Sequence, residues 1–322
     1  MTLSRLGLAA STAALFLTPT LALAAPQVVV SIKPVHSLVA AIMKGVGEPS
    51  LIVEGSASAH TYSLKPSHAR ALENADIVFW VGPGLEAFLE KPVDALAGKA
   101  KVVELEDAPG LVRLPFREGG AFEADDHEGE GEHAGHDADA AHDEHEHEHG
   151  GFDTHLWLDP MNAKAMAAEI ESALVTVDPD NAERYKANGA ALAAEIDALD
   201  KEIAATIQPV ANKPFVVFHD AYQYFENRYK VRVAGSITVS PETIPGAERI
   251  AEIHSKVKEL GAACVFAEPQ FEPKLVSVVT EGSDAQAGTL DPEGGALEAG
   301  PGLYPELMRN LAKSLTDCLS QS

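Results

Sequence analysis

Short apolar runs alternate with amphipathic segments through most of the chain. In the first part, the β-branched run Val28 to Ile32 is followed by residues 34–46, whose apolar positions recur with a helical period. The same alternation predicts further helices at 66–74 and 84–96 and strands at 77–81 and 101–105. Buried strands that alternate with amphipathic helices are typical of an α/β protein with a parallel sheet. We therefore predict a first lobe of this class.

Residues 178–208 carry the longest helical pattern. Asp178-Pro179 is a helix start, Pro209 ends the pattern, and the apolar residues between them recur every three or four positions. These residues are Leu192, Ile196, Leu199, Ile203 and Ile207. At about 1.5 Å per residue the helix would be about 45 Å long, which exceeds the width of a small domain. The pattern therefore predicts a rigid spine that joins two lobes.

Beyond Pro209 the alternation returns and predicts a second α/β lobe. The expected strands are 215–218, 232–237, 264–266 and 288–290, and the expected helices are 221–229, 245–260, 273–281 and 305–319. This lobe echoes the first in structure without a visible sequence repeat. We expect an N-terminal lobe over 26–177, a linker helix over 178–208 and a C-terminal lobe over 209–322. Each lobe is predicted to be a parallel sheet flanked by helices.

The first 25 residues have the features of a secretory signal peptide. Arg5 supplies a positive charge, Leu6 to Leu17 is apolar, and the small residues Ala22-Leu23-Ala24-Ala25 follow Pro19. The apolar run is too short for a membrane span, and no cysteine stands at the cleavage site. We therefore predict a periplasmic protein without a lipid anchor. In that oxidising compartment Cys264 and Cys318 are expected to form a disulfide that ties the last helix to the body, the alternative being two buried thiols.

An acidic, histidine-rich stretch at about 117–151 interrupts the pattern. Between Glu123 and His149 it holds twelve carboxylates, seven histidines and no Lys or Arg. Such a composition cannot bury enough apolar surface to fold, so we expect a disordered loop. The twelve acids account for nearly half of the net charge of −25. Because no basic patch is present, nucleic acid is not expected as a partner. The chain then resumes with a strand-like segment, 152–158, and Asp159-Pro160 opens a helix.

Four residues outside that stretch are candidate metal ligands. His219 and Asp291 follow short apolar strands, while His60 and His155 lie in loops. Ligands of parallel sheets bind beyond the carboxyl ends of the strands, where these side chains could meet. Three imidazoles and one carboxylate suit tetrahedral Zn²⁺, whereas Mg²⁺ and Ca²⁺ prefer oxygen ligands. Spacing alone leaves open that the four are separate, hydrogen-bonded loop residues.

Several longer motifs resemble the zinc-uptake solute-binding proteins, the ZnuA type of ABC-transporter receptor. The similar motifs occur in the family's order from about Val28 to the C-terminus, and they are residues 60–67 (HTYSLKPS), 155–160 (HLWLDP), 217–225 (VFHDAYQYF), 265–271 (VFAEPQF) and 288–292 (GTLDP). The resemblance implies two α/β lobes, one long helix between them and a metal site in the interlobe cleft. Its matching ligands here are His60, His155 and His219. Related manganese receptors have a carboxylate in the third place, so His219 implies zinc.

The resemblance leaves the fourth ligand open. Some members of the family use a glutamate directly before the first histidine, but Ala59 stands there in this chain. Asp291 matches an aspartate used elsewhere in the family, and water is the alternative. We predict Asp291. Glu268, near a strand end, is a candidate to hydrogen-bond a ligand imidazole.

The resulting functional prediction is a periplasmic zinc receptor that captures Zn²⁺ as cargo and hands it to the inner-membrane permease of an ABC importer. The acidic loop would serve as an auxiliary zinc-binding or sensing segment. A periplasmic zinc chaperone is a second candidate partner, and the receptor is expected to be a monomer. An enzyme is not expected, because the chain lacks a His-Glu-x-x-His helix and a Ser or Cys nucleophile motif. An adhesin is the third class considered, but the chain shows no anchor and no interaction repeat.

Overall fold

The computed structural model describes residues 25–117, 151–238, 246–259, 261–271 and 274–321. The predicted signal peptide and almost all of the acidic loop therefore lie outside the described residues. Two four-stranded sheets form the framework, and every pairing between strands in them is parallel. Among the described residues no helix is both long and apolar enough to cross a bilayer.

The first sheet has the strand order β2-β1-β3-β4. The elements of this part are β1 (Val28–Val30), α1 (Lys33–Ile42), β2 (Ser50–Leu51), η1 (Ala59–Thr61), α2 (Pro66–Asn74), β3 (Ile77–Trp80), α3 (Ala87–Leu96), β4 (Lys101–Glu104) and η2 (Leu105–Asp107). The central strands β1 and β3 are buried along their whole length, as their continuous apolar runs predict. The predicted strands and helices of this lobe are present, with bounds that differ by a few residues.

The segment 152–158 is not a strand, so that expectation is wrong. It contains a single isolated bridge between Pro115 and Phe152, followed by the 3₁₀ helix η3 (Leu156–Leu158). The reason is local hydrogen bonding, because the Asp153 carboxylate accepts the N–H of His155 at 3.0 Å and the N–H of Leu158 donates to the His155 carbonyl at 3.1 Å. Asp and neighbouring backbone groups that bond in this way turn the chain and withdraw it from a sheet.

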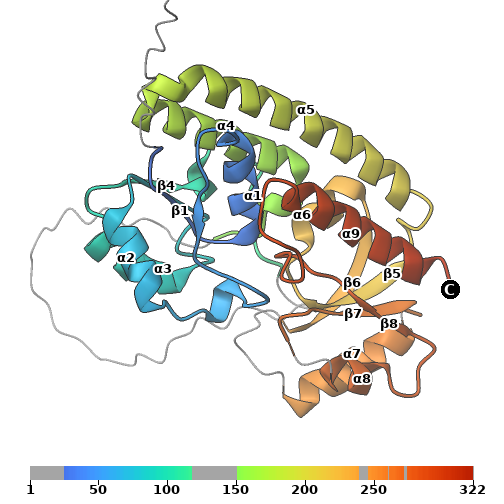
Figure 1. The fold of residues 1–322 in the computed structure, drawn as a ribbon. Coiled ribbons are helices and arrows are strands. Elements are labelled where there is room, and N and C mark those ends of the chain that lie inside the picture. The colour runs from blue at the N-terminus through green and yellow to red at the C-terminus, as the bar shows by residue number, and fades with distance from the viewer. Residues whose placement is uncertain (1–24, 118–150, 239–245, 260, 272–273, 322) are drawn as a thin grey trace, which may run out of the picture.

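Two long helices follow, α4 (Pro160–Val177) and, after the short turn η4 (Pro179–Asn181), α5 (Ala182–Ile207). The Asp159 side chain accepts the N–H of Met161, and Pro160 stands in the first turn of α4, as predicted. All five apolar positions that predicted the long helix are buried. Figure 1 shows α5 running along one side of the molecule, from the first sheet to the second.

The second sheet has the order β6-β5-β7-β8, which repeats the connectivity of the first. Its elements are β5 (Pro214–His219), α6 (Gln223–Tyr229), β6 (Arg232–Thr238), α7 (Ala247–Glu259), β7 (Cys264–Ala267), α8 (Lys274–Thr280), β8 (Gln286–Thr289) and α9 (Leu303–Leu319). One face is covered by α7 and α8 and the other by α5 and α9 (Figure 1). The predicted structural echo of the first lobe is therefore present in the topology.

The C-terminal helix α9 binds the two parts of the molecule together. It packs against both α1 and α5, and the Ser37 hydroxyl accepts the N–H of Tyr304 at 2.9 Å. The disulfide between Cys264 on β7 and Cys318 on α9 is formed, with Cα atoms 6.3 Å apart, which confirms the predicted pairing. As a result one continuous hydrophobic core extends from the first sheet through α4, α5 and α9 to the second sheet.

Candidate metal centre

Three of the four predicted ligands converge where the two lobes meet. The Nε2 atom of His155 lies 3.2 Å from Nε2 of His60 and 3.3 Å from Nε2 of His219. One ligand atom from each of the three rings lies within 4.8 Å of the others, the only such group of three among the described residues. Three nitrogen atoms at this spacing can share one metal ion, for which a Zn–N bond is about 2.0–2.1 Å.

His155 is oriented by a carboxylate two residues before it. The Asp153 Oδ1 atom lies 2.7 Å from Nδ1 of His155 and also accepts the backbone N–H of the same residue. Both side chains are buried. A ring that donates through Nδ1 presents the lone pair of Nε2, so Asp153 selects the tautomer that can bind metal. The sequence analysis missed Asp153, although the Asp-x-His spacing with a turn-forming Asp was a usable signal.

His219 is oriented in the same way from a neighbouring strand. It is the last residue of β5, and its Nδ1 lies 2.7 Å from Oε2 of Glu268, which follows β7. The Tyr222 hydroxyl donates to the other oxygen of Glu268 at 3.2 Å. The suggestion that Glu268 hydrogen-bonds a ligand imidazole is confirmed by this contact. Carboxylate–imidazole pairs of this kind raise the basicity of a metal-binding ring and fix its orientation.

His60 lies in the 3₁₀ turn η1, and its loop is held through the backbone. The Ser58 hydroxyl accepts the N–H of His60 at 3.3 Å and caps the turn. Burial, then the neighbouring charges of His155 and His219, lower the pKa of His60 well below its ordinary value. A lowered pKa keeps this ring neutral and able to donate its lone pair to a cation.

The electrostatics of His219 differ from those of His60. Burial is the largest single effect and acts to lower the pKa of His219, but the charge and hydrogen bond of Glu268, with the charges of Asp220 and Asp153, leave the pKa raised. The two carboxylates Asp153 and Glu268 therefore supply negative charge behind the nitrogen ligands. A buried cation is stable only where such compensating groups are present.

The carboxylate of Asp291 is not part of the histidine group. It accepts hydrogen bonds from Nε2 of Gln270 at 2.9 Å and from the backbone N–H groups of Gly295 and Ala296 at 3.0 and 3.1 Å. These bonds shape the turn after β8 in the manner of a capping aspartate. In this structure Asp291 therefore stabilises the turn beside the histidine centre.

A second acid of that turn, Glu293, was not singled out from the sequence. Its side chain is buried, and its carboxylate accepts the backbone N–H of Ala59, the residue before His60, at 3.2 Å. Burial raises the pKa of Glu293 to about 8, against the opposing effects of the Ala59 hydrogen bond and the charge of His155. No motif or spacing marks this residue, because the contact joins positions 234 residues apart.

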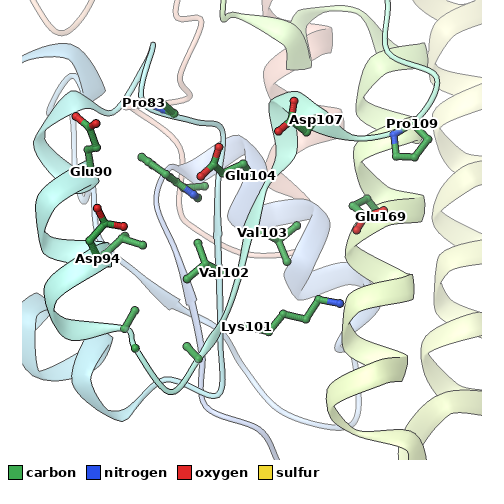
Figure 2. A pocket seen from close by; sticks show the side chains of 15 residues that line it. Pro83, Glu90, Asp94, Lys101, Val102, Val103, Glu104, Asp107, Pro109 and Glu169 are labelled. Atoms are coloured by element: carbon green, nitrogen blue, oxygen red, sulfur yellow. The ribbon is translucent and has the colours of Figure 1, made fainter. Parts of the chain in front are cut away.

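A hollow of about 910 Å³ elsewhere on the first lobe is distinct from the histidine centre. It lies beside the edge strand β4, and Figure 2 shows Glu90 and Asp94 on α3, Glu104 and Lys101 on β4, and Glu169 on α4 around it. None of the three histidines lines it. The geometry that suits a metal ion is therefore found at the junction of the lobes and not in this open, acidic hollow.

Two parallel α/β lobes bound by a long helix, with three converging histidines where they meet, define a metal-binding receptor of the kind that serves ABC importers. Comparison with known proteins supports this class and narrows it. The model of the family described as "ZnuA: Zinc-uptake complex component A periplasmic" matches residues 28–318. The chain belongs to this family, which confirms the resemblance inferred from the motifs.

Relatives and solved structures agree with that assignment. The protein is 54% identical over 306 residues to the high-affinity zinc uptake system protein ZnuA of Brucella suis biovar 1 (strain 1330), covering 91% of this chain and 92% of the relative. It is 37% identical to the protein of the same name from Yersinia pestis, with 92% of each chain covered. A solved structure described as "Crystal structure of ZnuA" superposes with a TM-score of 0.73 at 26% identity, over 91% of this chain and 99% of that one.

Proposed function

We propose that the protein captures Zn²⁺ in the periplasm and delivers it to the membrane permease of a zinc ABC importer. The observation that carries this function is the convergence of His60 and His219 on His155, with Nε2–Nε2 distances of 3.2 and 3.3 Å. The rings of His155 and His219 are each backed by a buried carboxylate. The high-affinity zinc uptake names of the relatives support the same cargo and the same kind of transport system. The protein acts as a binding component and not as an enzyme.

The donor set favours zinc over the harder divalent ions. Neutral imidazole nitrogen suits borderline ions such as Zn²⁺, whereas Mg²⁺ and Ca²⁺ bind through oxygen. His60, His155 and His219 are the proposed ligands. For the fourth position Asp291 stays the predicted carboxylate, with water as the alternative. Asp291 would have to exchange its bonds to Gln270 and to the turn backbone in order to reach the ion.

Release to the permease is proposed to occur through small shifts of the lobes. Several hydrogen bonds cross between them close to the centre. The Tyr224 hydroxyl on α6 donates to the Asp153 carbonyl at 2.6 Å, Trp157 Nε1 donates to the Pro292 carbonyl at 2.8 Å, and Arg117 pairs with Asp220. With α5 and α9 spanning both parts, wide opening would break many bonds together. A permease and a periplasmic zinc chaperone are the proposed partners of a monomeric receptor, with the acidic loop as an accessory zinc-binding segment.

The proposed function is tested by zinc titration against a competing chelator. The protein would begin at residue 26 and lack residues 127–149, so that the histidines of the acidic loop do not contribute. We expect one tight equivalent of zinc, which His219→Ala weakens by at least a thousandfold. His254→Ala is the matched control, because that imidazole bonds the Glu281 carbonyl outside the centre. Absence of a tight equivalent in the shortened protein would place zinc capture in the acidic loop and refute the proposed site.

A further inference from the structure

The three ligands are supported from different parts of the molecule. Asp153 and His155 both lie directly before η3, and Glu268 and His219 both lie at strand ends of the second sheet. Each of these two carboxylates therefore acts within one lobe. The loop of His60, in contrast, is contacted by a carboxylate that follows the second sheet, that of Glu293. This difference sets His60 apart, because its surroundings depend on how the two lobes meet.

The Glu293 carboxylate contacts the two residues that precede His60. The Oε2 and Oε1 atoms of Glu293 lie 3.2 and 3.4 Å from the Ala59 nitrogen, and the Ser58 hydroxyl lies 3.5 Å from Oε1. The same Ser58 hydroxyl accepts the N–H of His60. The Glu293 side chain is only 6% exposed, so water does not offer an easy substitute for these bonds. A continuous chain of contacts thus runs from Glu293 to a ligand.

The segment that carries Glu293 is itself anchored to the first lobe. The Lys33 ammonium group, at the start of α1, donates to the carbonyls of Gly294, Gly295 and Leu297 at 3.2, 2.9 and 2.7 Å. At Gly295 an added Cβ would lie 3.0 Å from Cα of Ser56, so this turn packs closely on the loop that precedes His60. The anchored turn gives Glu293 a defined position from which to hold the loop.

We propose that Glu293 is a positioning residue for zinc capture, which holds the His60 loop in its metal-binding place from across the lobe junction. This inference rests on the proposed function. It assigns to Glu293, acting through the Ser58 hydroxyl and the Ala59 backbone N–H, the part that Asp153 and Glu268 play through the rings of the other two ligands. Loss of this contact would free the His60 loop, and zinc would then dissociate sooner.

The geometry distinguishes positioning from direct ligation. Glu293 does not belong to the group of described residues whose ligand atoms lie within 4.8 Å of one another, while its oxygens lie within hydrogen-bond distance of the Ala59 nitrogen. An amide at this place can still accept one backbone hydrogen bond, whereas a methyl group cannot. Gln should therefore preserve the role of Glu293, and Ala should abolish it.

The test compares Glu293→Ala and Glu293→Gln with the unmodified protein, all shortened at the acidic loop as above. Zinc affinity is measured by chelator competition, zinc release by stopped-flow mixing with excess chelator, and ligand geometry by the visible absorption of the Co²⁺ form. Glu298→Ala is the control, since Glu298 is exposed on the same segment. We expect Ala to weaken zinc about 10- to 100-fold, mainly through faster release, with the Co²⁺ spectrum unchanged at saturation. Gln is expected within about threefold of the unmodified protein.

Two results would overturn the inference. If Ala binds and releases zinc as the unmodified protein does, the contact has no part in capture. If Gln is as weak as Ala and both alter the Co²⁺ spectrum, Glu293 is a direct ligand. Should Ala fail to fold by circular dichroism, Glu293→Asp replaces it, since the shorter side chain withdraws from Ala59 and should give a smaller loss of the same kind. A missing tight site in the unmodified protein would refute the proposed function instead.

Discussion

The two sheets share one connectivity but present different chemistry at their carboxyl ends. In the second sheet β5 ends in the ligand His219, and β7 is followed by Glu268, which orients it. In the first sheet β3 and β4 are followed by an acidic pair, Glu86 and Glu106. The ligand His60 lies in the 3₁₀ turn η1, and His155 directly precedes η3. In both sheets the polar groups lie at the edge formed by the carboxyl ends of the strands, as is usual for parallel sheets.

The parallel topology places polar groups at the carboxyl edge of each sheet. Which of these groups can bind metal depends on the individual residues that stand there. Glu86 accepts the N–H groups of Val81 and Gly82 at 3.2 and 3.0 Å, so it closes the turn after β3. At Gly82 a side chain would collide with the Glu106 carboxylate, which lies within 2.2–2.7 Å of the place of a Cβ. The ends of β3 and β4 are therefore occupied by their own acids, and the two histidines of the first lobe stand in loops.

Among the effects that bear on this comparison, the largest concerns the disulfide, which links β7 of the second sheet to α9 and has no counterpart among the described residues of the first sheet. Replacing Cys264 and Cys318 by Ala should lower the free energy of unfolding by about 2–4 kcal/mol, because the link between β7 and α9 restrains the unfolded chain. Zinc affinity should be retained, since neither residue adjoins a ligand. Denaturant unfolding checks this, with dithiothreitol as the control: it should destabilise the unmodified protein and leave the double variant unchanged. Equal midpoints for both proteins would contradict the prediction.

A smaller effect is expected from the orienting carboxylates, one in each lobe. Glu268→Gln and Asp153→Asn should each weaken zinc about 10- to 100-fold, or about 1.4–2.8 kcal/mol, because the amides no longer fix the metal-binding tautomer. Tyr222→Phe removes only one donor to Glu268 and should cost at most about tenfold. Chelator competition measures all three. Comparable affinities for Glu268→Gln and the unmodified protein would show that the strand-end pair has no such role.

The smallest expected effect is a change in how stability depends on pH. It concerns the buried acids that follow the strands of the first sheet. Burial raises the pKa of Glu86 to about 7, from an ordinary value of 4.5. Between these values the folded state keeps a proton that the unfolded chain has released, so the free energy of unfolding falls as pH rises through this window. Glu86→Gln should reduce this loss by about 1–2 kcal/mol.

Thermal unfolding at several pH values between 5 and 8 measures the slope. Glu90→Gln, at an exposed position of the nearby α3, is the matched control and should keep the slope of the unmodified protein. Glu106 has a pKa raised to about 7 by the same cause, burial, so the slope of Glu86→Gln should be reduced and not removed. An unchanged slope in Glu86→Gln would mean that this acid does not set the pH response of the first lobe.

Most of the secondary structure could be predicted because its signals are local. The buried runs at 77–81 and 215–218 are central strands, and the repeat from Leu192 to Ile207 is the inner face of α5. The prediction failed at 152–158, where an aspartate bonded to the neighbouring backbone competes with an apolar strand-like pattern. Periodicity records which residues prefer burial, but it does not record such side-chain bonds.

By itself the sequence determined the class of the protein, the two lobes, the cysteine pair and the three histidines, because motifs and apolar periods are properties of neighbouring residues. Only the tertiary structure decided which partner each carboxylate near the centre contacts. Glu268 reaches His219 across 49 residues and Glu293 reaches Ala59 across 234, while Asp291 bonds the turn beside it. Carboxylates of equal chemistry differ in role according to the partner that packing brings within about 3 Å, and that distance is set by the whole fold.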